Sequence, residues 1–173
     1  MSEYQRQRKE KPPVDAAVAQ LPEPTRGAAA DFVAFLRENH MSPQWGSTNS
    51  WNVSHKSRRV CIIKVQQDAW QIWLNTQYNG AFDARFDEAP ETWRAYLRER
   101  IPSCYGCGSC KPGLTRAILG ELQEGACINP VIRMENPEGE MLGLARELVL
   151  LRKEAIAAGE APKATYTAMS KRT

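Results

Sequence analysis

The sequence predicts an α+β fold in which an antiparallel sheet is covered by helices on one side, in the order α-β-β-β-α-(Cys loop)-β-β-α. Apolar residues recur at helical spacing in three segments, and apolar and polar residues alternate in others, as in strands. Short polar breaks between those strands favour antiparallel pairing. With 173 residues and 42% hydrophobic content, the chain has the size of one domain with its own core.

The first predicted helix covers residues 27–40. Its apolar residues Ala28, Phe32, Phe35 and Leu36 fall at positions i, i+4, i+7 and i+8, which lie on one helical face. We therefore expect this face to pack against the sheet.

Three strands are predicted next. Trp51 and Val53 alternate with polar residues, as in a strand with one buried face. The segments HKSRR and QQDA are polar breaks of hairpin length. The expected strands lie near residues 49–55, 59–66 and 69–77.

The third of these strands has two different faces. One face carries Trp70, Ile72 and Leu74 and is expected to point into the core. On the other face a tryptophan among amides can line a ligand pocket, or it can lie beneath a loop, and the sequence leaves both interpretations open. The candidate ligand-binding residues are Gln71, Trp73 and Asn75.

A second helix is predicted to begin at Pro90, a residue favoured at helix starts. Its buried stripe is expected to contain Trp93, Tyr96, Leu97 and Ile101. Beyond the cysteine-rich segment that follows, TRAILG and NPVIRME each have the pattern of a short strand. A turn around Glu124 and Gly125 is expected between them.

The last helix has clear start and stop signals. Asn136 is expected to cap it, Pro137 suits its first position and Gly159 can terminate it. The residues expected to face the core are Met141, Leu144, Ala145, Leu148 and Leu151.

Four of the five cysteines lie between residues 104 and 127, and three of them repeat at every third position in a glycine-rich loop. Closely spaced thiolates can converge on one metal ion, and zinc accepts four of them tetrahedrally. The sequence therefore predicts a structural zinc site, which would order this segment. Its ligands would be Cys104, Cys107, Cys110 and Cys127.

Other interpretations of the cysteines remain open. Their opening spacing resembles that of a bacterial ferredoxin, although Cys110 is followed by Lys111 and the fourth cysteine comes late, so an iron-sulfur cluster is the second interpretation. Alternatively, Cys107 and Cys110 form a redox-active pair. In either case the protein would be a metal- or thiol-dependent oxidoreductase.

Charge gives little support to a nucleic-acid partner. The chain has 23 basic and 20 acidic residues and a net charge of +3. A nucleic-acid-binding zinc protein is therefore the third interpretation. Its phosphate contacts would be Lys111, Arg116 and Arg133.

Both ends of the chain are predicted to lie outside the folded domain. Residues 1–25 are basic and rich in proline, and residues 159–173 are rich in alanine, lysine and threonine. We expect a disordered N-terminal tail, a single α+β domain over residues 26–158 and a flexible C-terminal tail.

Localisation is predicted to be cytoplasmic. The sequence has no apolar run near the roughly 20 residues that a membrane span requires, and no apolar segment follows the polar N-terminus. An odd number of cysteines, most of them closely spaced, fits a reducing compartment better than a disulfide framework.

Three segments carry a resemblance to a known group of proteins. They are STNSWNVSHKSRRVC, CYGCGSCKPG and ENPEGEMLGLARELVLLRK, which lie within residues 26–155. In these segments the chain resembles small uncharacterised bacterial α+β proteins, of the domain-of-unknown-function kind, that carry a Cys-rich loop. The resemblance implies a small α+β fold with a bound small molecule, and it brings no catalytic residue.

The sequence thus favours a cytoplasmic binding module with a small molecule or a protein as its partner, and it leaves enzymatic activity open. Neither histidine has a visible catalytic partner, and no nucleophile and base pair is apparent.

Overall fold

The computed structural model describes residues 1–104 and 113–160. Its elements in chain order are α1 (Glu3–Glu10), α2 (Val14–Val18), α3 (Thr25–Glu38), β1 (Gln44–Ser47), β2 (Ser50–His55), β3 (Arg58–Gln66), β4 (Ala69–Asn75), α4 (Gly80–Phe86), α5 (Glu91–Arg98), β5 (Leu114–Ile118), β6 (Glu121–Ala126), β7 (Val131–Glu135) and α6 (Gly139–Ala157). The predicted α+β class is confirmed.

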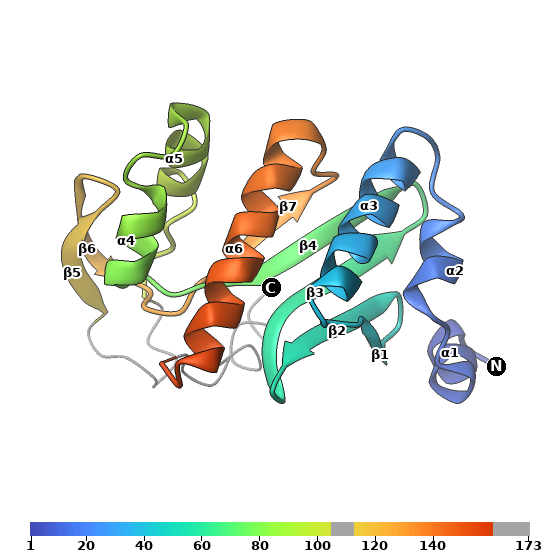
Figure 1. Ribbon diagram of the computed structural model, residues 1–173. Coiled ribbons are helices and arrows are strands. Elements are labelled where there is room, and N and C mark those ends of the chain that lie inside the picture. The colour runs from blue at the N-terminus through green and yellow to red at the C-terminus, as the bar shows by residue number, and fades with distance from the viewer. Residues whose placement is uncertain (105–112, 161–173) are drawn as a thin grey trace.

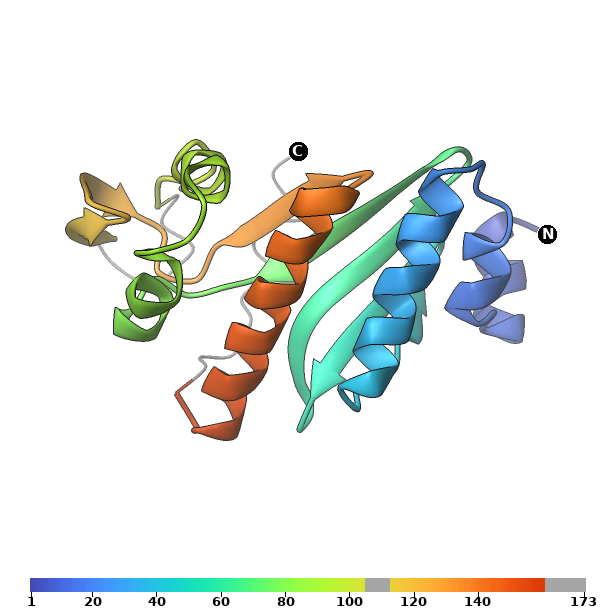
Figure 2. The same ribbon diagram turned by 45° about the horizontal axis from the view of Figure 1, so that its top comes forward.

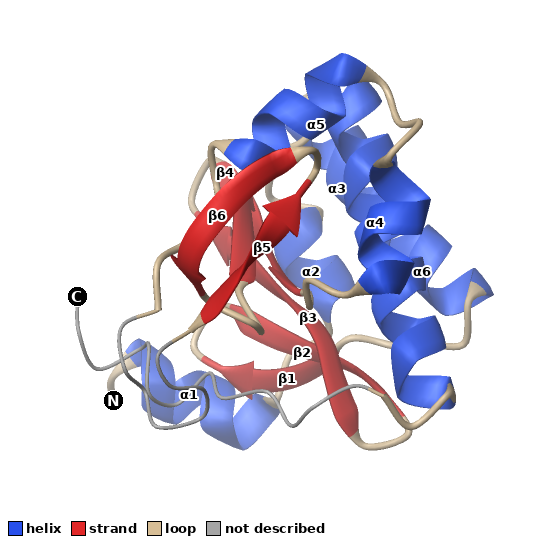
Figure 3. Ribbon diagram, turned by 90° about the vertical axis from the view of Figure 1, so that its left-hand side faces the viewer, coloured by secondary structure: helices blue, strands red, loops and turns tan. Residues whose placement is uncertain are grey.

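A five-stranded antiparallel sheet of order β1-β2-β3-β4-β7 forms the centre of the fold. Helices α3 and α6 lie side by side on one of its faces (Figures 1 and 2). Seen from the end, α3 and α6 form a layer on one side of the strands, whereas α1 lies apart beside β1 (Figure 3). The hairpin β5–β6 is a separate two-stranded sheet beside α4 and α5.

The core lies between α3, α6 and the sheet. Cross-strand register places Ile63 opposite Ile72, and both side chains are fully buried. From the helix layer, Phe32 packs against Trp70 with ring centroids 5.8 Å apart. Burying an aliphatic or phenyl side chain of this size contributes about 1.5–3 kcal/mol. The face of β4 that carries Trp70, Ile72 and Leu74 is therefore the one that α3 and α6 cover, as predicted.

The three predicted strands are confirmed by β2, β3 and β4. Strand β1 was not predicted, because its four residues QWGS are too few for an alternating pattern. It pairs with β2 through a register shift between Trp45 and Ser47. Strand β1 is thus the edge strand of the sheet, and its pairing with β2 stabilises it.

The prediction of a disordered tail over residues 1–25 was wrong. This segment forms α1 and α2, and Val14, Val18 and Leu21 are at most 5% exposed. The prolines that suggested disorder stand at helix boundaries, where the missing N–H costs nothing: Pro13 caps α2 and Pro24 caps α3.

The expected turn around Glu124 and Gly125 was also wrong. Both residues lie within β6, and the chain reverses at Leu119 and Gly120, which have positive φ angles of 53° and 82°. Two central residues with positive φ are typical of a tight hairpin turn. The predicted strand TRAILG therefore pairs with β6, while β7 joins β4 in the main sheet.

Asn136 does not cap the last helix as predicted. Helix α6 begins at Gly139 after Glu138, and the Asn136 side chain instead accepts a hydrogen bond from the Trp70 backbone at 2.8 Å. The Asn136 N–H donates to the Trp70 carbonyl at 2.9 Å. Asn136 thus joins β7 to β4. The predicted helix end is confirmed, because Gly159 follows α6 with φ of 77°.

The predicted C-terminal tail falls largely on residues 161–173, which lie outside the described residues. Within residues 1–104 and 113–160, none of the helices has both the length and the apolar composition needed to cross a membrane.

Candidate thiolate site and sheet face

Cys104 and Cys127 come together in a short antiparallel pairing. Ser103 pairs with Ala126, and each cysteine donates its backbone N–H to a carbonyl of the opposite segment, at 2.7 and 2.8 Å. Successive residues of an extended segment point to opposite faces, so both cysteines lie on the face opposite Ser103 and Ala126. Two predicted metal ligands that are distant in sequence therefore share one side of this pairing.

Gly113 closes the segment that begins at Cys104. Its φ is +104°, and a Cβ at this position would lie 2.9 Å from the Cys104 Cβ and 2.9 Å from the Gly125 backbone. Only glycine fits there without displacing backbone. Gly113 therefore lies directly beside Cys104.

The remaining predicted ligands, Cys107 and Cys110, lie outside the described residues. Within the described part, no group of three or more His, Cys, Asp or Glu side chains is arranged to hold a metal ion.

Tyr78 lies beside this pairing. Its backbone N–H donates to the carbonyl of Ile128 at 3.2 Å, which aligns it with the residue after Cys127. The side chain is 3% exposed and packs edge-on against Phe82, with centroids 4.9 Å apart. Burial, and secondly the negative charge of Cys127, raises the pKa of Tyr78. Its hydroxyl has no hydrogen-bond partner among the described residues.

The second predicted site lies on the sheet face opposite α3 and α6. Trp73 donates its indole N–H to Gln71 Oε1 at 2.8 Å, so these two predicted residues are in contact. Asn75 is only 6% exposed, where β4 pairs with Val131. The structure thus brings two of the three candidate ligand-binding residues together at the surface.

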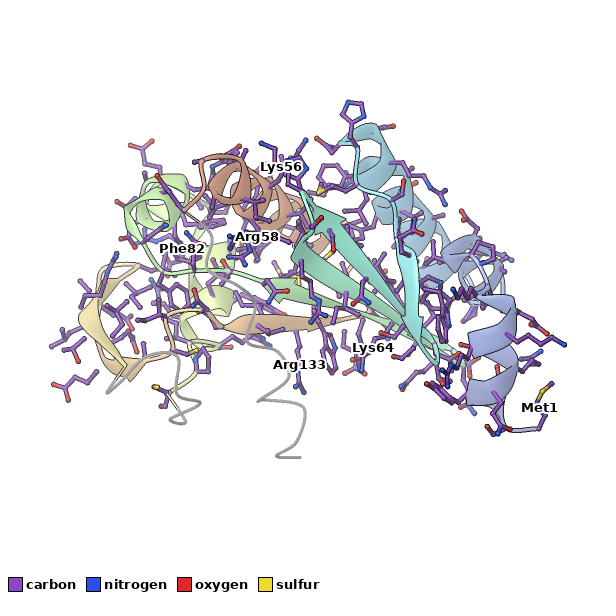
Figure 4. All side chains as sticks on the ribbon, turned by 90° about the horizontal axis from the view of Figure 1, so that it is seen from below. Met1, Lys56, Arg58, Lys64, Phe82 and Arg133 are labelled. Carbon is purple, nitrogen blue, oxygen red and sulfur yellow. The ribbon has the colours of Figure 1, made fainter. Side chains whose placement is uncertain are left out.

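Two cations that the sequence did not connect with this face lie over Trp73. Lys64 Nζ is 3.7 Å and Arg133 Cζ is 4.2 Å from the centre of the indole. They come from β3 and β7, the strands on either side of β4, and Figure 4 shows both on the side of the sheet away from the helices. Burial, and then the positive charge of Arg133, lowers the pKa of Lys64. Neither cation forms an ion pair within the described part.

The cations could not be placed from strand pattern alone. Arg133 lies opposite Trp73 because β7 pairs with β4, which is far away in sequence. Lys64 lies on the same face as Trp73 because β3 pairs with β4 in the register that places Ile62 opposite Trp73.

An open hollow of about 360 Å³ adjoins Arg133. Its lining consists of Gln71, Tyr96, Arg100, Arg133, Met134 and Glu135. The Arg100 guanidinium stacks over Tyr96 at 3.6 Å, and the Tyr96 hydroxyl donates to the Arg133 carbonyl at 3.3 Å. The end of α5 is thus tied to β7 at the edge of this face.

A larger hollow of about 440 Å³ lies between the N-terminal helices and the sheet. Its charges are of both signs, and Arg6 and Glu3 neutralise each other at 2.6 Å. Glu10 also lines it, so this hollow offers no net positive charge to an anion.

Of the three predicted phosphate contacts, the two that the structure describes do not form one patch. Arg116 on β5 is paired with Asp83, whereas Arg133 lies on the face of the other sheet, and Lys111 is outside the described residues. The described geometry thus gives the nucleic-acid interpretation no support.

Comparisons with family models, with curated proteins and with solved structures find no match for this chain. The resemblance to uncharacterised bacterial proteins with a Cys-rich loop therefore stays a prediction.

Proposed function

We propose that this protein is a small binding module whose fold is completed by a structural zinc ion and whose ligand binds on the Trp73 face of the sheet. The zinc ligands in this proposal are Cys104, Cys107, Cys110 and Cys127. Four thiolates in tetrahedral array satisfy zinc without an open position, which suits a structural role.

The observation that carries the zinc proposal is the pairing of Ser103 with Ala126. It holds Cys104 and Cys127 on one side of a hydrogen-bonded ladder, although they are distant in sequence. Without this pairing, bringing Cys127 to the same ion as Cys104 would cost additional loop-closure entropy.

Chain length supports the other two ligands. Cys107 lies three residues after Cys104, and Cys110 lies three residues before Gly113, which contacts Cys104. Three residues span at most about 11 Å. Chain length therefore allows both thiols to reach the same ion as Cys104 and Cys127.

The Tyr78 hydroxyl also supports a thiolate site. A buried hydroxyl that lacks an acceptor costs about 1–3 kcal/mol. Cys127 is the neighbouring group whose charge acts on Tyr78, and a zinc-bound thiolate sulfur accepts hydrogen bonds. The hydroxyl makes no hydrogen bond to Cys127 in this structure; in our proposal it donates to Cys127 once zinc binds, and so orients this ligand.

Elemental analysis of protein purified without added metal, with its visible spectrum, tests the zinc proposal. We expect about one zinc per chain and no colour. Cys127→Ala should lose the metal, whereas Cys61→Ala should keep it, because Cys61 is fully buried in β3. If the protein contains iron and sulfide and is brown, the site holds an iron-sulfur cluster and the zinc proposal is wrong. Metal-free protein with unchanged stability would refute the structural site.

A further inference from the structure

We propose that the Trp73 face binds a small molecule through a phosphate group, held by Lys64 and Arg133 with Arg100 at its edge. This inference specifies the ligand of the proposed binding module and is independent of the zinc site.

Uncompensated positive charge is the first observation. Lys64 and Arg133 lie over the same indole, at 3.7 and 4.2 Å, and neither has an acidic partner within 4.0 Å among the described residues. Because both cations lie over one indole, they are close enough to repel each other, and partial burial of Lys64 strengthens the repulsion. An anion bound near both of them would relieve it. By contrast, Arg98 on α5 is paired with Glu91 and Glu121.

The orientation of the guanidinium groups is the second observation. A guanidinium that stacks on an aromatic ring uses its face for the ring and keeps its edge N–H groups for acceptors. Arg133 stacks on Trp73 in this way, and Arg100 stacks on Tyr96 at 3.6 Å. Arg100 also donates to the Tyr96 carbonyl at 3.2 Å and has a weak, exposed contact with Glu99. Among the described residues, Arg133 thus has more side-chain donors available than Arg100.

The third observation is the shape and charge of the adjoining hollow. Its 360 Å³ are enough for a small ligand, and Arg100 and Arg133 both line it. Glu135 lines it too, and Gln71 contacts Glu135 at 3.5 Å. This carboxylate repels an anion, so the anionic group is expected on the Arg133 and Lys64 side and the uncharged part of the ligand near Glu135.

A phosphate fits these donors better than a carboxylate does. The cations approach from β3, from β7 and from the end of α5, which are different directions. A tetrahedral phosphate offers three oxygens to donors from several sides and carries up to two negative charges. A carboxylate offers two oxygens in one plane and one charge.

The test uses the indole N–H of Trp73 as a reporter in ¹⁵N-labelled protein, used as purified. This N–H is hydrogen-bonded to Gln71, and Trp73→Phe identifies its NMR signal by deletion. Titration with inorganic phosphate should move the signal saturably, whereas chloride at equal ionic strength should not. Arg133→Gln and Lys64→Gln should each weaken the binding roughly tenfold, the loss expected for one charge-assisted contact.

Arg26→Gln is the matched control, because it removes one positive charge at an exposed pair on α3, away from this face. It should bind phosphate like the natural protein. The inference is overturned if phosphate moves the signal no more than chloride does, if acetate binds as tightly as phosphate, or if Arg133→Gln binds unchanged. Zinc content, measured on the same samples, reports separately on the metal site.

Discussion

The replacement Gln7→Ala tests whether the N-terminal helix belongs to the folded domain. Gln7 lies on α1 and is 6% exposed, although the segment around it is strongly polar. Its amide nitrogen donates to Asn49 Oδ1 at 2.6 Å, and its amide oxygen accepts from the Asn49 backbone at 2.8 Å and from the Trp45 indole at 3.3 Å. These three contacts fasten α1 to the β1–β2 turn.

The expected cost follows from these contacts. A hydrogen bond contributes about 0.5–1.5 kcal/mol net, and the partly buried Asn49 N–H would be left without its partner. We expect Gln7→Ala to lower the free energy of unfolding by about 2 kcal/mol. For a chain of this length, that corresponds to a melting temperature lower by roughly 4–8 °C.

Urea unfolding followed by tryptophan fluorescence measures this change. Gln20→Ala is the matched control, because within the described part of the chain the exposed Gln20 side chain donates only to the Ala16 carbonyl one turn away, at 3.2 Å. It should change the free energy of unfolding by less than about 0.5 kcal/mol. If the two variants were equally stable, α1 would contribute nothing to the fold and the original prediction of a tail would be restored.

Three further predictions concern single residues. Tyr78→Phe should leave the metal-free protein equally or more stable but weaken its zinc binding in a chelator competition, because the proposed donor to Cys127 is lost; equal zinc affinity would contradict that role. Gly113→Ala should lower both melting temperature and zinc content, since its Cβ would meet backbone at 2.9 Å, whereas Gly80→Ala, with nothing within 4 Å, should preserve both by the same measurements. Asp15→Asn should cost less than about 1 kcal/mol at pH 7 and progressively less as the pH falls below the unfolded-state pKa, as measured by urea unfolding over a series of acidic pH values. An arginine of α3 lowers the pKa of Asp15 through a hydrogen bond, so the stability it provides is present above the unfolded-state pKa and is lost as pH falls through the folded-state pKa; a cost that did not fall with pH would exclude the ion pair as its cause.

Much of the sheet and its covering helices could be predicted, because their pattern is local. Trp70, Ile72 and Leu74 alternate with polar residues, and all three are at most 1% exposed. The N-terminal helices could not be predicted in the same way. Gln7 is buried by hydrogen bonds to residues of β1 and the β1–β2 turn, and a polar side chain gives no hydrophobic periodicity.

Long-range pairing also limited what could be predicted of the candidate sites. Asn136 has the sequence signature of a helix cap, yet its φ of 44° and its bonds to Trp70 serve β4. Trp73 could be assigned to the exposed face from its neighbours, but the position of Arg133 over it depends on β7 pairing with β4. The spacing of residues along the chain predicted which residue types each site contains. The pairing of strands that are distant in sequence determines which of these residues come into contact.

The pairing of Asn75 with Val131 has a consequence for how this architecture can change over evolutionary time. Residues 76–130 leave the sheet at the end of β4 and return at the adjacent position of β7, and Thr76 donates to the Pro130 carbonyl at 3.1 Å. The entropy of closing such an excursion grows only logarithmically with its length. Insertions and deletions in the part of the chain that carries four of the five cysteines therefore need not alter the register of any strand in the main sheet. This part can diversify while the scaffold that presents Lys64, Trp73 and Arg133 stays constant.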